Sequence, residues 1–148
     1  MDEKRVVSIF LVDGNSTFLC IVKRFLLGQD ALEVVGATCC GEEALGQIKA
    51  LQPDLVLMDP FEIDATGLEG VAHVRQAVPE AGIIVTTLLN ADGSRDGYRR
   101  AVLGAGADDF VSKDALAADL LPAIDRILEA NGRTKKALSS LQMGYAAA

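Results

Sequence analysis

Short apolar runs alternate with helix-spaced apolar patterns along most of the chain. The runs that predict buried strands lie at residues 6–12, 32–37, 55–58, 83–87 and 109–111. After each run, apolar residues recur at spacings of three and four, which predicts helices that pack against the strands. Strands that alternate with helices form a parallel sheet with right-handed crossovers. The pattern therefore predicts an α/β fold, a five-stranded parallel sheet with helices on both faces.

Local signals place several helix boundaries. Ser16 is the candidate N-cap of the first helix, Gly28 is expected to end that helix, and Gly106 is expected to cap the fourth helix. The last helix is predicted at residues 116–130, and Pro122 should bend it or mark its first turn. The buried stripe of the second helix is expected to consist of Ala44, Leu45, Ile48 and Leu51.

Polar side chains follow four of the predicted strands. Asp13 and Asp59 end the first and third apolar runs, Thr87 closes the fourth, and Lys113 follows the fifth. Because the carboxyl ends of parallel strands share one edge of the sheet, these four residues are expected to converge there. Open α/β sheets place their chemistry at this edge.

In the order and spacing of these motifs, the chain resembles a response-regulator receiver domain, the phosphoacceptor half of two-component signalling. The matching stretches are residues 10–13, residues 53–59, Gly67, Thr87 and residues 105–114. The resemblance covers roughly residues 6 to 131. It implies a flavodoxin-like, doubly wound sheet of strand order 2-1-3-4-5, with the first and third strands beside the topological switch point. We expect a receiver domain over residues 1–131 and a tail or linker remnant over residues 132–148.

The resemblance also implies roles for the converging residues. Asp59 would accept a phosphoryl group from a histidine kinase or phosphotransfer protein. Asp13, Asp59 and the backbone carbonyl of Phe61 would hold Mg²⁺, a hard cation that suits oxygen ligands. Lys113 would pair with the phosphoryl oxygens, and the Thr87 hydroxyl would donate a hydrogen bond to the phosphorylated form. Such a domain is a signalling phosphoacceptor and not an enzyme, beyond assisting its own phosphorylation and dephosphorylation.

Several positions depart from the family pattern. Gly14 stands where receivers usually have a second acid, so we expect weaker Mg²⁺ binding. Glu62 is a candidate substitute ligand, although a solvated loop acid is the simpler interpretation. Pro60 removes a backbone donor beside Asp59. Leu88 replaces a small residue and is expected to crowd the entrance of the pocket.

These departures leave an alternative open, a pseudo-receiver that acts as a phosphorylation-independent protein-interaction module. A flavodoxin-like enzyme or nucleotide binder lacks support, because no glycine-rich phosphate loop follows the first strand. In the family, an aromatic residue near the fifth strand, here Phe110, responds to phosphorylation. The implied output surface is the fifth strand with the last two helices, facing a downstream protein target, and a homodimer is also left open.

Composition narrows the class of partners. The chain has 148 residues, which predicts one domain, and its formal net charge is −7. That charge argues against direct binding to nucleic acid through a basic surface. No apolar run is long enough to span a bilayer and the start lacks a signal-peptide layout, so we expect a soluble, cytoplasmic protein without a membrane partner.

The sequence predicts no metal-binding or catalytic role for the cysteines or the histidine. Cys20, Cys39 and Cys40 lack the spacing of a metal site, and we expect reduced, mostly buried thiols. His73 lies in a helical pattern, where a surface or packing role is expected.

Overall fold

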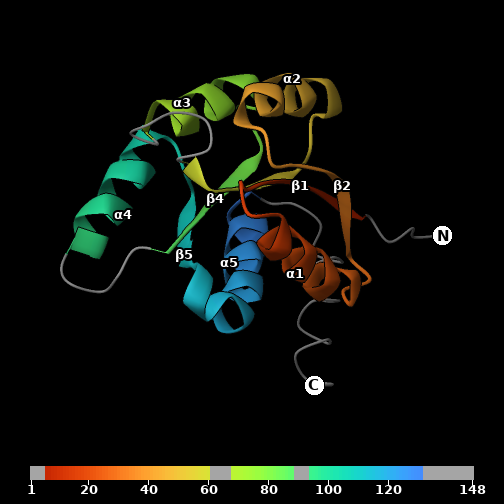
Figure 1. Ribbon diagram of the computed structural model, residues 1–148. Helices are drawn as coiled ribbons and strands as arrows, with labels where there is room; N and C mark the ends of the chain where they lie inside the picture. Colours follow the sequence, from red (N-terminus) through yellow and green to blue (C-terminus); the bar gives the residue numbers. More distant parts are fainter. Residues whose placement is uncertain (1–5, 61–67, 89–93, 132–148) are drawn as a thin grey trace.

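The five strands form one parallel sheet in the order β2-β1-β3-β4-β5 (Figure 1). The structure is a computed structural model that describes residues 6–60, 68–88 and 94–131. The strands are β1 (Val7–Val12), β2 (Leu32–Thr38), β3 (Leu55–Met58), β4 (Gly82–Thr87) and β5 (Asp109–Ser112). The predicted strand order is confirmed, and each strand agrees with its predicted run to within a residue at either end.

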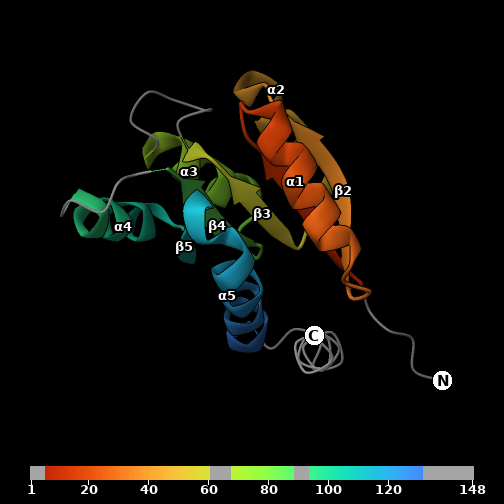
Figure 2. The same cartoon turned by 60° about the horizontal axis from the view of Figure 1, so that its bottom comes forward.

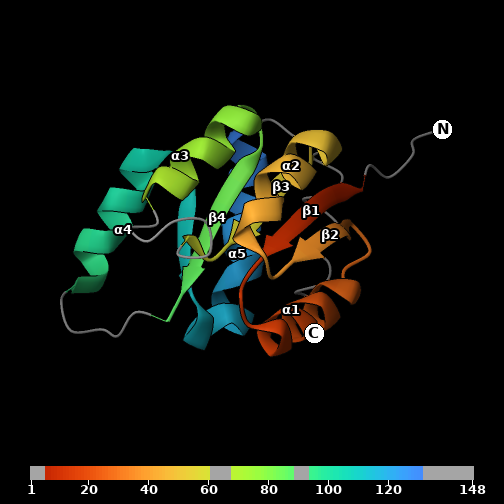
Figure 3. The same cartoon turned by 45° about the horizontal axis from the view of Figure 1, so that its top comes forward.

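Helices cover both faces of the sheet. α1 (Ser16–Leu27) and α5 (Leu116–Ala130) lie on one face, toward the viewer in Figure 2. The other face, turned forward in Figure 3, carries α2 (Gly41–Leu51), α3 (Leu68–Ala77) and α4 (Ser94–Ala105). A short 3₁₀ turn, η2 (Lys113–Ala115), joins β5 to α5. None of the helices in the described ranges combines the length and apolarity that crossing a bilayer requires.

The strands are apolar on both faces because each face is covered by helices. Every residue of β3 and β4 is buried. Alternate side chains of one strand enter opposite cores, so that Leu55 and Leu57 pack with α1 and α5, whereas Val56 and Met58 pack with α2, α3 and α4. The two cores fix the register of the central strands, and therefore the positions of the residues that follow them.

Two predictions about helices are wrong. Asn15, and not Ser16, is the N-cap of α1, because its side-chain oxygen accepts a hydrogen bond from the backbone N–H of Phe18 at 3.0 Å. Leu51 is 48% exposed: it is the last residue of α2, and its side chain lies against Gly36 of β2, the edge strand of the sheet.

Pro122 lies inside α5, beyond the first turn. The helix continues through it because its apolar stripe is buried against the sheet, which outweighs one lost backbone hydrogen bond. The cysteines also differ from expectation, since all three are exposed. Cys20 lies on the solvent side of α1, and Cys39 and Cys40 lie in the connection from β2 to α2. His73 is exposed, as expected for a surface residue.

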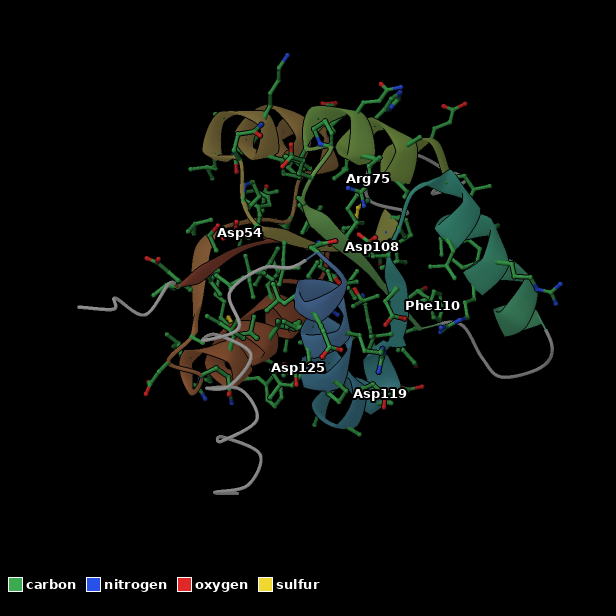
Figure 4. All side chains as sticks on the ribbon, turned by 180° about the vertical axis from the view of Figure 1, so that it is seen from behind. Asp54, Arg75, Asp108, Phe110, Asp119 and Asp125 are labelled. Atoms are coloured by element: carbon green, nitrogen blue, oxygen red, sulfur yellow. The ribbon has the colours of Figure 1, made fainter. Side chains whose placement is uncertain are left out.

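Arg75 ties α3 to the amino end of β5, and Figure 4 labels it beside Asp108. Its guanidinium donates to the carboxylate of Asp108 at 2.7 Å and to the carbonyl oxygens of Gly106 and Ala81. Gly106 has a φ of 129°, and a Cβ there would lie 3.1 Å from the Cβ of Arg75. The predicted cap at Gly106 is thus required both by its backbone conformation and by close packing.

We predict that Gly106→Ala destabilises the domain by about 1–3 kcal/mol, because it strains the backbone and crowds Arg75. Gly104→Ala is the matched control, since Gly104 is helical and a Cβ there meets nothing within 4 Å. The control should stabilise by about 0.5–1 kcal/mol through helix propensity. Urea unfolding measures both, and a Gly106→Ala variant as stable as the control would contradict this interpretation.

Asp125 gives the domain a pH-dependent stability. One oxygen of its carboxylate is buried without a hydrogen-bond partner among the described residues. Burial raises the pKa of Asp125 from 3.8 to about 6. The negative charge of Glu129 adds to this increase, and the positive charge of Arg126 partly opposes it. The folded state therefore holds this proton more tightly than the unfolded chain does. The associated stability is present below the unfolded pKa and is lost as the pH rises through about 6.

We predict that Asp125→Asn removes this loss, which is on the order of 1 kcal/mol after allowance for solvent screening. Relative to the wild type, the variant should gain stability between pH 4 and pH 7, as measured by urea unfolding at several pH values. Asp119→Asn, on the exposed first turn of the same helix (Figure 4), should keep the wild-type pH dependence. Parallel pH profiles for wild type and Asp125→Asn would be evidence against a raised pKa.

Candidate functional site

Two carboxylates and one ammonium group meet at the carboxyl edge of the sheet. Lys113 Nζ lies 2.6 Å from Asp13 Oδ2 and 3.1 Å from Asp59 Oδ2. Asp13 follows β1, Asp59 follows β3 and Lys113 follows β5, so three separate strands deliver the three groups. The backbone N–H of Asp59 donates to the carbonyl of Val12 at 2.9 Å, which continues the pairing of β1 and β3 up to the site.

Asp13 is held on both of its carboxylate oxygens. Oδ1 accepts a hydrogen bond from the backbone N–H of Asn15 at 2.9 Å, and Oδ2 pairs with Lys113. Asn15 is also the N-cap of α1, so Asp13 lies directly before the positive end of that helix. The residue as a whole is only 3% exposed. A buried carboxylate in this position is stabilised by one cation and one backbone dipole.

Lys113 is charged at neutral pH although its side chain is buried. Burial alone would lower its pKa, but hydrogen bonds to Asp13 and Asp59, together with their charges, outweigh burial, so the pKa of Lys113 is raised. Its Nζ also lies 4.6 Å from the centroid of the Phe18 ring. By formal charge the three groups carry a net −1, because one cation is shared by two anions.

An open hollow of about 620 Å³ lies over these groups. Its lining residues are Asp13, Gly14, Asn15, Ser16, Cys39, Asp59 and Lys113. A second hollow of about 560 Å³ lies near Arg75 and Asp108 at the other end of the sheet, where the polar groups already bond one another. We therefore assign the chemistry to the first hollow, in which charged groups converge on open space.

The other predicted residues are placed less directly. Thr87 ends β4, is buried, and is in register with Ser112, the residue before Lys113; it is not among the described residues that line the hollow. Phe61 and Glu62 lie outside the described residues. Leu88 is 60% exposed and likewise does not line the hollow, so the described structure does not show it crowding the site.

Three contributors to the site were missed at the level of sequence. The N-cap signal of Asn15 was present, since asparagine is among the best N-cap residues. Cys39 gave no signal, because its place on the rim depends on how β2 ends. The contact of Phe18 with Lys113 joins residues far apart in the chain and has no local signature.

Comparison with known proteins defines the class. The model of the response regulator receiver domain matches residues 9–125, so the chain belongs to this family and to two-component signalling. Among curated relatives, it is similar to the response regulator protein VraR of Staphylococcus aureus, with 29% identity over 118 residues, 80% of this chain and 54% of the relative. The VraR protein of Staphylococcus epidermidis is 27% identical over 123 residues, 83% of this chain and 57% of the relative. The chain thus spans about half the length of these relatives.

Solved structures agree on the fold. A two-component response regulator of the LuxR family from Aurantimonas sp. superposes with a TM-score of 0.74 at 24% identity, covering 95% of this chain and 99% of that one. A response regulator receiver domain protein from Methanospirillum hungatei gives a TM-score of 0.71 at 25% identity, covering 86% and 97%. The flavodoxin-like arrangement predicted from sequence is confirmed.

The described residues suit a magnesium ion, but they offer it few ligands. Asp13 and Asp59 supply two carboxylates that approach the same point in space, where Lys113 now provides the positive charge. No group of three or more histidine, cysteine or acidic side chains suited to a metal occurs within residues 6–60, 68–88 and 94–131. One or two carboxylates with water are sufficient for Mg²⁺, although binding is then weak.

We predict that Gly14→Asp strengthens Mg²⁺ binding by roughly tenfold or more, because it adds a negative charge beside Asp13. Gly14 lines the hollow and is not among the residues with positive φ, so its backbone accepts a side chain without strain. Gly14→Asn has the same shape without the charge and should bind as the wild type does. Calorimetric titration with Mg²⁺ measures both variants, and equal affinities for Asp and Asn at this position would contradict the prediction.

Proposed function

We propose that Asp59 accepts a phosphoryl group from a phosphohistidine on a histidine kinase or phosphotransfer protein. The observation that carries this proposal is the placement of Asp59 on an open hollow, paired with a lysine that it shares with a second acid. A carboxylate used only to cap a loop would need neither the shared ammonium group nor the open approach. The same feature favours a phosphoacceptor over a phosphorylation-independent interaction module.

The transfer is a displacement at phosphorus. A carboxylate oxygen of Asp59 attacks, the new O–P bond forms as the P–N bond breaks, and the imidazole leaves and takes a proton from water. Because two anions must approach each other, catalysis consists mainly of positioning and charge neutralisation. Lys113 is close enough to Asp59 to neutralise part of this charge and then to pair with the phosphoryl oxygens.

We further propose that Mg²⁺ supports the transfer, held by Asp13, Asp59 and the backbone carbonyl of Phe61. When bound, the ion supplies the positive charge that a single lysine lacks. Lys113 already contacts one oxygen of each acid, so it and the cation would draw on the same two carboxylates. This is a second reason, beside Gly14, to expect weak Mg²⁺ binding.

Phosphorylation would be read out through β5, α4 and α5. Phe110 of β5 is buried, and its ring meets that of Tyr98 from α4 edge to face, with centroids 6.1 Å apart. Asp109 pairs with Arg126 of α5 at 2.7 Å and with Arg99 of α4 at 3.5 Å. These contacts couple both helices to the strand that leads to Lys113, which suits a population shift that changes a surface for a downstream protein.

In this proposal Thr87 donates a hydrogen bond to the phosphorylated form, from its position at the end of the neighbouring strand. We also propose that the receiver domain comprises residues 1–131 and that residues 132–148 belong to a tail or linker remnant. Recognition is between proteins in the cytoplasm. Neither nucleic acid nor membrane is required, and a homodimer is compatible with the proposal.

We predict that acetyl phosphate with Mg²⁺ adds the mass of one phosphoryl group to the protein and that Asp59→Asn abolishes the gain, because an amide is not nucleophilic. Intact-protein mass spectrometry over a range of Mg²⁺ concentrations measures both. Asp30→Asn is the control, an exposed acid outside the hollow, and should be modified as the wild type is. An unchanged wild-type mass at every metal concentration, or a gain that survives Asp59→Asn, would refute the proposal.

A further inference from the structure

Lys113 has a third partner that its role in the receiver family does not require. Its Nζ lies over the face of the Phe18 ring, 4.6 Å from the centroid. The two carboxylates approach the same ammonium group at 2.6 and 3.1 Å. An aromatic face attracts a cation through its quadrupole, most strongly where water is largely excluded. The Lys113 side chain is 9% exposed, so this condition is met.

Phe18 is itself fixed in place. Its backbone N–H donates to the N-cap side chain of Asn15, whose own N–H donates to Asp13. Its ring is partly buried and packs against the core formed with α1 and α5. The same first turn of α1 thus orients Asp13 through a backbone N–H and presents the aromatic ring to Lys113.

A flexible lysine would not by itself hold this geometry. Its ammonium group is a point charge on a four-carbon stem, with no directional preference between two acids. Asp13 lies closer to the ammonium group than Asp59 does, at 2.6 Å against 3.1 Å. Without another contact, Asp13 would therefore pull the ammonium group away from Asp59. The ring adds an attraction from a further direction and covers the ammonium group with a surface that does not compete for the phosphoryl oxygens.

We propose that Phe18 is a positioning residue that holds the Lys113 ammonium group between Asp13 and Asp59. The inference rests on the proposed function and adds a residue to it. Phe18 touches no reacting atom and acts only through Lys113. An aliphatic side chain of similar size would fill the space but would leave the ammonium group without this attraction.

The test compares substitutions that keep or remove the aromatic face. Phe18→Leu should slow phosphorylation by acetyl phosphate about three- to tenfold, the range of a partly desolvated cation–π contact, whereas Phe18→Tyr should stay within about twofold of the wild type. Phe25→Leu is the matched control. Phe25 is two turns further along α1 and packs against the same core, so its loss should lower stability without slowing phosphorylation.

A second readout does not depend on phosphorylation. The Phe18 ring current should shift the ε-methylene protons of Lys113 upfield in the NMR spectrum of the metal-free protein. The shift should be retained in Phe18→Tyr and Phe25→Leu and lost in Phe18→Leu. Phosphorylation of Phe18→Leu at the wild-type rate, or of Phe18→Tyr as slowly as Phe18→Leu, would overturn the inference. If the wild type is not phosphorylated, the proposed function fails, and an unchanged Lys113 shift in Phe18→Leu would separately overturn the positioning role.

Discussion

The shared ammonium group of Lys113 is the interaction on which the site depends. Two carboxylates within a few ångströms of each other repel, and neither is exposed enough for water to screen that repulsion fully. One cation between them offsets that repulsion. The raised pKa of Lys113 expresses the same balance, since the two acids outweigh the cost of burial. Without Lys113, the one partner of the Asp13 carboxylate within the described ranges would be the backbone N–H of Asn15.

The fold brings the carboxyl ends of β1, β3 and β5 together at one edge of the sheet. Two apolar cores on opposite faces of the sheet lock the register of β1, β3 and β4, and β5 follows at the edge. The polar residues at the carboxyl ends then have little freedom in where they lie. At the amino end, Arg75 and Asp108 bind α3 to the start of β5, so the same strand is anchored at one end and carries Lys113 at the other. Open α/β sheets bind their ligands outside the carboxyl ends of the strands, which is the end that carries Lys113 here.

Much of this arrangement could be predicted from sequence, because the signals were local. The apolar runs predicted the strands. The polar residues that follow those runs predicted that Asp13, Asp59 and Lys113 lie close together. What failed depended on context. Leu51 fits a helical stripe but ends its helix beside the edge strand β2, where it stays half exposed, and the cysteines were expected to be mostly buried but are exposed. Two contacts depend on the tertiary fold and have no pattern in the sequence that predicts them. They are the contact of the Phe18 ring with Lys113 and the pairing of Asp109 with arginines of α4 and α5.

The most direct measurement is chemical identification of the modified residue. Borohydride reduces an aspartyl phosphate to homoserine, so reduction after treatment with acetyl phosphate, followed by peptide sequencing in the mass spectrometer, locates the acceptor. The account predicts homoserine at position 59 and at no other acid. Homoserine at position 13 or elsewhere in place of position 59 would contradict it, because the cluster around Lys113 would then not direct the phosphoryl group to Asp59.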